Sequence, residues 1–168
     1  ISASTAGSVN AFIGDGATVT AGSVALSATG TQTPTVSSSF VGVSGLSIGL
    51  TTVSASDTTA VRAYVGSAAG GTSATSVTTT GAAGVAATAT GTSKTRATAD
   101  FVSVGILGSG GKTTTTATSA SSALAFVGTN ASVDSQGYDI AFTGAAKAAA
   151  AAQGSGVNAS LGVAAGTA

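Results

Sequence analysis

Small apolar and polar residues alternate along much of the chain. In the N-terminal part, apolar residues follow a period of two among Thr, Ser and Asn, which is typical of strands that bury one face. These residues are Val9, Ala11, Ile13, Val19, Ala21, Val24, Leu26 and Ala28. Glycine-containing segments at 14–16, 22–23, 69–71 and 135–137 interrupt the pattern and supply the positive φ angles that tight corners need. We therefore expect strands joined by short turns.

Two later segments continue the alternation. Leu46, Ile48 and Leu50 alternate with small residues, so these three side chains are expected on one inward face. The same pattern recurs with Val102, Val104 and Ile106. Both segments therefore predict strands with an apolar inner face.

Two other features modify this picture. Pro34, the only proline, cannot donate to a sheet ladder and is expected at a corner or a sheet edge. Residues 145–152 are mostly alanine, which favours a helix by local propensity. Their alignment with residues 82–90, which alternate like a strand, favours a strand instead, and a short capping helix is the alternative.

The chain repeats itself. The tetrapeptide Ala-Phe-Ile-Gly at 11–14 recurs as Ala-Tyr-Val-Gly at 63–66 and as Ala-Phe-Val-Gly at 125–128. A second anchor follows at 28–30, 80–83 and 143–146, and a third at 40–43, 101–104 and, more weakly, 160–163. Self-similarity at a long period predicts one repetitive domain of three imperfect units, at about 1–60, 61–122 and 123–168.

Side-chain size favours one architecture over another. Ala, Gly, Ser, Thr and Val dominate the 168 residues, and only 4% are aromatic. A β-solenoid encloses a narrow interior that such residues can fill, whereas a β-sandwich core about 10 Å thick needs large side chains from both sheets. We expect an all-β solenoid, with a string of β-sandwiches as the alternative. If one coil takes roughly 20 to 30 residues, the chain makes roughly six to eight coils.

The composition also excludes several kinds of chemistry. The chain has no Cys, His, Met or Trp, which removes disulfides, thiolate or imidazole metal sites, and catalysis by Cys or His. Five basic residues balance five Asp, so the chain lacks the charge that nucleic acids or anionic membranes attract. We predict no catalytic residue, no metal site and no cofactor, no nucleic-acid partner and no membrane insertion.

Isolated polar groups have simpler structural interpretations. Gly14-Asp15-Gly16 lacks the stacked glycine-rich repeat of calcium sites and is interpreted as a turn. Asp134 and Asp139 flank Gly137 without further carboxylates nearby in the sequence, and Lys94-Thr95-Arg96 is interpreted as a solvated corner. The two Tyr and five Phe are expected to stack in the core rather than to form a binding platform.

Two polar patterns are also given structural interpretations. The threonine runs at 18–20, 78–80 and 113–116 are irregularly spaced, so we interpret them as cross-strand pairs, with an ice-binding face as a remote alternative. Asn130-Ala131-Ser132 and Asn158-Ala159-Ser160 fit the N-glycosylation pattern, which arises easily by chance in such a chain.

The segment AFIGDGATVTAGSVALSAT, residues 11–29, resembles the repeats of large bacterial exoproteins related to filamentous haemagglutinins and filamentous adhesins. The resemblance covers most of the chain through the three units, although the DGATVT portion is clear only in the first. It implies a right-handed parallel β-helix that is secreted and displayed at the cell surface for adhesion, aggregation or biofilm matrix building. The family carries no catalytic residues that could be transferred to this sequence.

These observations lead to two functional hypotheses. The first is an extracellular structural or adhesive segment of a filamentous surface or matrix protein, part of a longer chain and without enzymatic activity. The second is a self-assembling fibre subunit, joined end to end or by strand exchange. In both, the main partner is another copy or a neighbouring repeat of the same chain, and the first also allows a cell surface or glycan.

Overall fold

The structure is built from strands only. A computed structural model describes the backbone of residues 1–167 and the side chains of residues 1–162, so residue 168 of the third expected unit lies outside the described residues. The strands are β1 (Ser2–Ile13), β2 (Thr18–Ala21), β3 (Val24–Gln32), β4 (Thr35–Val65), β5 (Thr75–Thr79), β6 (Val85–Ser119), β7 (Ser122–Val127), β8 (Ala131–Asp134), β9 (Ile140–Ser160) and β10 (Val163–Thr167). The described residues contain no helix, and the alanine-rich segment 145–152 lies within β9. The all-β prediction and the strand expected at 145–152 are confirmed.

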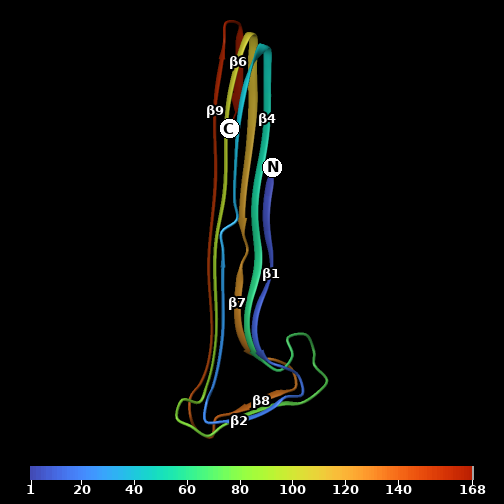
Figure 1. The fold of residues 1–168 in the computed structure, drawn as a ribbon, viewed down its shortest axis with the longest axis vertical. Coiled ribbons are helices and arrows are strands. Elements are labelled where there is room, and N and C mark those ends of the chain that lie inside the picture. Colours follow the sequence, from blue (N-terminus) through green and yellow to red (C-terminus); the bar gives the residue numbers. More distant parts are fainter. Residues whose placement is uncertain (168) are drawn as a thin grey trace.

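The chain runs up and down a long shaft (Figure 1). We call residues 24–44, 85–105 and 140–160 the ascending layer, and residues 2–13, 46–65, 108–127 and 163–167 the descending layer. Because β4 and β6 bend at the upper end, each contributes to both layers. The short strands β2, β5 and β8 form a separate sheet at the lower end, which we call the foot.

Each pass of the chain pairs in parallel with the next. Ala11 of β1 lies beside Ala63 of β4, and Ala63 lies beside Ala125 of β7. These are the three copies of the first sequence anchor, so one pass of the chain corresponds to one expected unit.

The expectation of six to eight short coils was wrong, because the strands are far longer than assumed. The described residues make about three passes, and β6 alone is 35 residues long.

The second and third sequence anchors are aligned differently in the structure. Gly30 lies beside Gly91, so the second copy of this anchor is at 89–91 and not at 80–83. Val102 lies beside Val157, which places the third copy of the other anchor near 156–159 and not at 160–163. The alanine segment 145–152 likewise pairs with 90–97 rather than 82–90. Short segments of Ala, Thr and Gly recur so often in this chain that sequence similarity alone does not determine which segments pair in the sheet.

The core is a thin layer between the ascending and descending layers. One cluster joins Ala28, Ala87 and Ala89 of the ascending layer to Val61 and Ala63 of the descending layer. The layers approach so closely that a Cβ atom added at Gly30 would lie 2.7 Å from a Val61 methyl group. The space between the layers is so small here that alanine, valine and threonine fill most of it.

The expected turns are present at the predicted places. Gly16, Gly70 and Gly137 have φ angles of 76°, 84° and 92°, which side chains other than glycine rarely adopt. Pro34 lies in the short gap between β3 and β4, on an outermost segment of the sheet. The predictions of positive φ angles at 14–16, 69–71 and 135–137 and of a proline at a sheet edge are confirmed, whereas Gly22 does not adopt a positive φ angle.

The side chains near the upper end face the opposite way from the prediction. Leu46, Ile48 and Leu50 are 65%, 69% and 79% exposed, whereas their neighbours Ser47 and Gly49 point inward. The second segment is reversed in the same way, with Val102, Val104 and Ile106 outward and Ser103 inward.

Two phenylalanines explain this reversal. Phe40 and Phe101 extend from the ascending layer into the narrow interior, and Phe101 is only 3% exposed. A Cβ atom at Gly49 would lie 2.7 Å from the Phe40 ring, and one at Gly111 would overlap the Phe101 ring. The opposite positions must therefore be glycine or another small residue, and the large aliphatic side chains turn to the outside.

The reversal gives a direct stability test. Val53→Ala should lower the free energy of unfolding by about 2 kcal/mol, because Val53 is fully buried and loses two methyl groups. Ile48→Ala should change it by less than about 0.5 kcal/mol, because Ile48 is largely exposed. Chemical denaturation followed by circular dichroism measures both. A larger loss for Ile48→Ala than for Val53→Ala would contradict the observed orientation.

Candidate functional site

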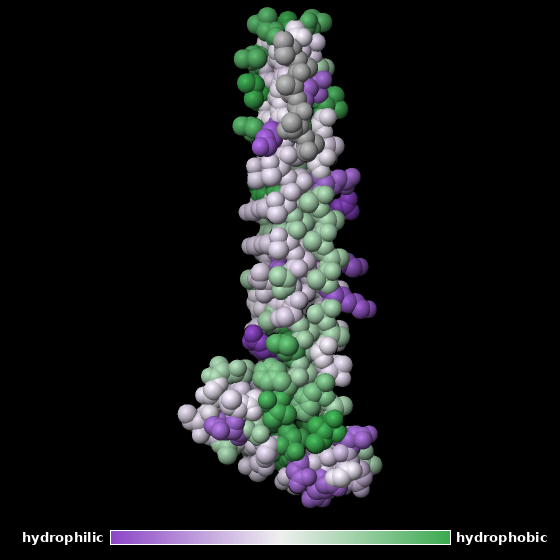
Figure 2. All heavy atoms as spheres, turned by 180° about the vertical axis from the view of Figure 1, so that it is seen from behind, coloured by the Kyte–Doolittle hydropathy of each residue, from purple (hydrophilic) through white to green (hydrophobic). Residues whose placement is uncertain are grey.

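Most of the exposed large hydrophobic side chains of the described residues lie at the upper end of the shaft. Seen from behind, hydrophobic side chains gather at the bends and along the left side of this end (Figure 2). We call this set the tip: Val41, Val43, Leu46, Ile48, Leu50, Val102, Val104, Ile106, Leu107, Val157 and Leu161. An exposed apolar surface of this kind marks a contact region in a soluble protein. The sequence pattern did not reveal the tip, because six of these eleven residues were expected to face the interior.

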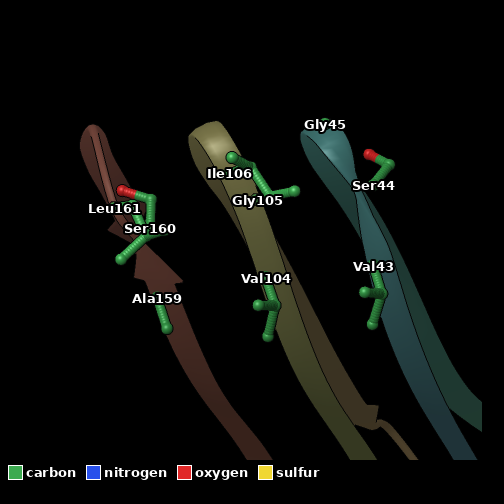
Figure 3. A pocket seen from close by; sticks show the side chains of 9 residues that line it. All are labelled: Val43, Ser44, Gly45, Val104, Gly105, Ile106, Ala159, Ser160 and Leu161. Carbon is green, nitrogen blue, oxygen red and sulfur yellow. The ribbon is translucent and has the colours of Figure 1, made fainter.

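A shallow hollow runs across the tip. It has a volume of about 440 Å³ and is lined by residues from three neighbouring segments of the ascending layer. Val43, Val104 and Ala159 lie side by side on these segments, and Ile106 and Leu161 stand above them at the bends (Figure 3). The hollow contains no charged side chain, so it suits an apolar partner.

Polar side chains lie inside the shaft beneath the tip. The Ser103 hydroxyl is fully buried and donates to the Ser47 hydroxyl at 2.8 Å, with the Ser47 carbonyl at 3.2 Å. The buried hydroxyl of Ser109 and the Asn158 side-chain oxygen have no hydrogen-bond partner in the structure. The usual arrangement of a soluble protein is thus reversed here, with hydroxyl groups inside and aliphatic groups outside.

A second polar region lies halfway down the interior. Asp57 is completely buried, and its Oδ1 atom accepts hydrogen bonds from the Thr59 hydroxyl at 2.7 Å and the Thr59 backbone N–H at 3.1 Å. The Ser93 hydroxyl, which accepts from Ser119 at 2.5 Å, lies close to the same carboxylate. The Asp57 Oδ2 atom has no hydrogen bond of good geometry.

Burial and hydrogen bonding act on the pKa of Asp57 in opposite directions. Burial raises the pKa, and hydrogen bonds from Ser93 and from the hydroxyl and backbone of Thr59 lower it. The hydrogen bonds outweigh the burial because the shaft is too thin to remove the carboxylate far from water, and the pKa of Asp57 lies below its usual value. Asp57 is therefore a charged group inside the shaft at neutral pH.

Two of the other carboxylates, those of Asp15 and Asp134, accept hydrogen bonds in turns of the foot, whereas Asp100 lies in the shaft and accepts from the Ser155 hydroxyl. The Asp15 carboxylate accepts a hydrogen bond from the Ser73 backbone N–H at 3.3 Å, which links two turns far apart in the sequence. Asp134 accepts from the Gln136 backbone N–H at 2.8 Å in the turn before Gly137. Among the described residues, no three acidic side chains come together in a way that could hold a metal ion.

The aromatic residues divide between the two faces of the sheet. Phe40, Phe101 and Phe142 belong to the inner face, as expected, although the Phe40 side chain remains 37% exposed. Phe12, Tyr64 and Phe126 instead stack on the outer face of the descending layer, with ring centroids 5.3 and 5.2 Å apart and ring planes within 8° of parallel. Tyr138 is 45% exposed in a turn of the foot. The prediction that all seven aromatic side chains form the core was therefore wrong for these four.

The basic residues lie elsewhere than expected. Lys94 and Arg96 point outward from the middle of β6 and line a hollow of about 370 Å³ with Thr33 and Thr35. They are on a straight part of the shaft rather than at a corner. Thr95 between them is buried, as the alternation of a strand requires.

The threonine runs and glycosylation motifs do not form common surfaces. The runs at 18–20 and 78–80 meet in the foot, where Thr20 pairs with Thr78, whereas the run at 113–116 is in the shaft. Asn130 donates to the Gly71 carbonyl at 2.6 Å in a turn. The Asn158 side chain lies on the inner face, which leaves little access for a glycosyl group.

The chain matches no known family model, no curated protein and no solved structure. Within the part of the chain that the structure describes, no helix is long and apolar enough to span a membrane. The interpretation of function therefore depends on the geometry of the shaft, the foot and the tip.

Asp57 should make the stability of the shaft depend on pH. Because its folded pKa is lowered, its stabilising contribution is fully present above the unfolded value of 3.8 and is lost as the pH falls through the folded pKa. Asp57→Asn should flatten this acid loss and lower stability at pH 7 by about 1 kcal/mol, because a neutral amide accepts weaker hydrogen bonds than a carboxylate. Thermal unfolding between pH 2 and 7 measures both, with Asp139→Asn as a control for net charge. An unchanged acid slope in Asp57→Asn would refute this role.

The tip should bind apolar probes. The triple substitution Val43→Ser, Ile106→Ser and Leu161→Ser should reduce the fluorescence of an apolar dye such as anilinonaphthalene sulfonate by about twofold, because it removes the exposed apolar lining of the hollow. The control combines Phe12→Ser and Leu124→Ser, which remove exposed apolar groups at the other end of the shaft. Equal losses in both variants would show that the dye does not bind preferentially at the tip.

Proposed function

We propose that this chain is a segment of a right-handed parallel β-solenoid in an extracellular filamentous surface or matrix protein, with a structural and adhesive role and no catalysis. The observation that supports this proposal is the parallel, in-register pairing of each pass with the next. Such stacking makes a stiff element from small side chains, and it needs neither disulfides nor a large core.

The pairing between passes is long enough for a mechanical role. The ladder between β4 and β6 has ten consecutive pairs from Thr35 to Ser44 and twelve from Leu46 to Asp57. Each pass also fills the interior against its neighbours, so separating one pass breaks backbone hydrogen bonds and exposes apolar groups together. This coupling supports a function in which rigidity is the property that is used.

The tip supports the adhesive part of the proposal. Its exposed side chains are aliphatic and uncharged, and they occupy one end of an elongated molecule. An apolar surface of a cell or of a matrix component is the partner that this chemistry favours, because contact removes aliphatic area from water. Loss of adsorption to methyl-terminated beads in the triple tip variant described above would support this contact.

A self-assembling fibre subunit is the second candidate. It is favoured by the outermost segments of both layers, which present backbone groups without partners in the described structure. The two candidates share the same fold and differ in whether separate copies join. A solenoid segment can serve the first function within one chain, whereas the second needs contacts between chains.

Stretching single molecules tests the structural role. Force applied to the two ends should unfold the shaft in abrupt steps, each releasing about 200 Å as one pass extends by about 3.3–3.6 Å per residue. Ala89→Asp should lower the unfolding force, since Ala89 is completely buried, whereas the exposed Thr88→Asp should not. Smooth extension without steps would argue against a structural role.

A further inference from the structure

The two outer edges of the stack of passes are different surfaces. The first edge consists of β1, β2, β3 and the early part of β4, and the last edge consists of β8, β9 and residues 113–127. Sheet edges are usually protected from pairing by charge. The first edge has Asp15 as its only charged side chain, and the last edge has Asp134, Asp139 and Lys147. The strands of the first edge therefore carry no protective charge, and the long strand β9 of the last edge carries Lys147 alone.

The register between passes predicts how these edges would meet. Ser2 lies beside Ser54, and Ser54 lies beside Thr116. If a second copy followed the last pass of the first copy in the same register, Ser2 of the second copy would lie beside Thr116 of the first. β10 pairs with Gly108–Lys112 only, so β1 of a second copy could cover residues 116–127 without overlapping β10.

The inner rows of the two edges match in polarity at this register. Apolar positions meet apolar positions and the polar position meets a polar one. Across the descending layer the inner pairs are Ala3 with Ala117, Thr5 with Ser119, Val9 with Ala123, Ala11 with Ala125 and Ile13 with Val127. Each of these pairs would extend a row of equivalent inner positions that already runs from one pass to the next within the protein.

The other parts of the edges match as well. In the ascending layer, Val24 would meet Ile140 and Leu26 would meet Phe142. In the foot, Val19 would meet Val133. On the outer face, Phe12 of the second copy would extend the stack of Phe12, Tyr64 and Phe126 by one ring.

We infer that the last edge of this protein docks the first edge of a second copy in the same parallel register, so that copies add to one another across their strands. This inference rests on the proposed parallel solenoid and specifies its partner. A heterologous contact of this kind does not close, and it generates a filament. In that filament the tips of successive copies would form one continuous apolar ridge.

Cysteine cross-linking tests this register, because the chain contains no cysteine of its own. Asn10 and Leu124 are both exposed, and they occupy the same row through Arg62. In the inferred contact, Asn10→Cys of one copy and Leu124→Cys of another have Cα atoms about 4.8 Å apart, which a disulfide can bridge. Asn10→Cys with Ser122→Cys is the matched control, since a shift of two positions along the strand separates the Cα atoms by about 8 Å.

The two single-cysteine variants are mixed at high concentration and oxidised. We expect the Asn10–Leu124 heterodimer to exceed the control heterodimer by about tenfold. Electron microscopy of the unmodified protein should show filaments with a repeat of about 4.8 Å along their axis. Equal cross-linking of both pairs, homodimers of either variant alone, or monomers at every concentration would overturn the inference.

The failure of this inference can be distinguished from the failure of the proposed function. A monomer that retains its β-sheet circular dichroism and its stepwise unfolding under force would be a solenoid segment whose edges do not join copies. Loss of stepwise unfolding would instead contradict the structural role itself.

Discussion

The parallel ladder between successive passes is the interaction on which the other features of the structure depend. Because it holds equivalent positions side by side, a residue that fits the interior in one pass must fit again in the next, as Ala11, Ala63 and Ala125 do. Each pass is long, because the chain runs through the foot and both layers before it lies beside its own equivalent position in the ladder. The repetition visible in the sequence is a consequence of this stacking.

The close approach of the two layers is the second constraint. A narrow interior is filled by Ala, Val, Ser and Thr over most of the shaft, and near the upper end it holds Phe40 and Phe101 opposite glycine positions. Near the upper end, Phe40 and Phe101 use the available volume, so aliphatic residues of the same strands turn outward. The apolar tip and the packing of the core are therefore two results of one limit on volume.

Polar groups inside the shaft follow from the same geometry. Some hydroxyl groups pair across the interior between the two layers, as Ser103 does with Ser47 and Ser119 does with Ser93. Asp57 is tolerated because Thr59 donates to it twice and because water is never far from such a thin body. The foot, whose turns are held by the carboxylates of Asp15 and Asp134, connects the layers without any large side chain in its short strands.

The sequence by itself determined the strand content, the glycine turns, the position of Pro34 and the spacing of the first anchor. Each of these depends on local backbone preference or on an aromatic residue that occurs rarely enough to align. Only the tertiary structure decided the number of passes, the register of the Ala-Thr-Gly segments and the orientation of Leu46, Ile48 and Leu50. The physical reason is that a period of two identifies two faces without saying which is inside. That choice was made by the volume that Phe40 and Phe101 occupy between the layers.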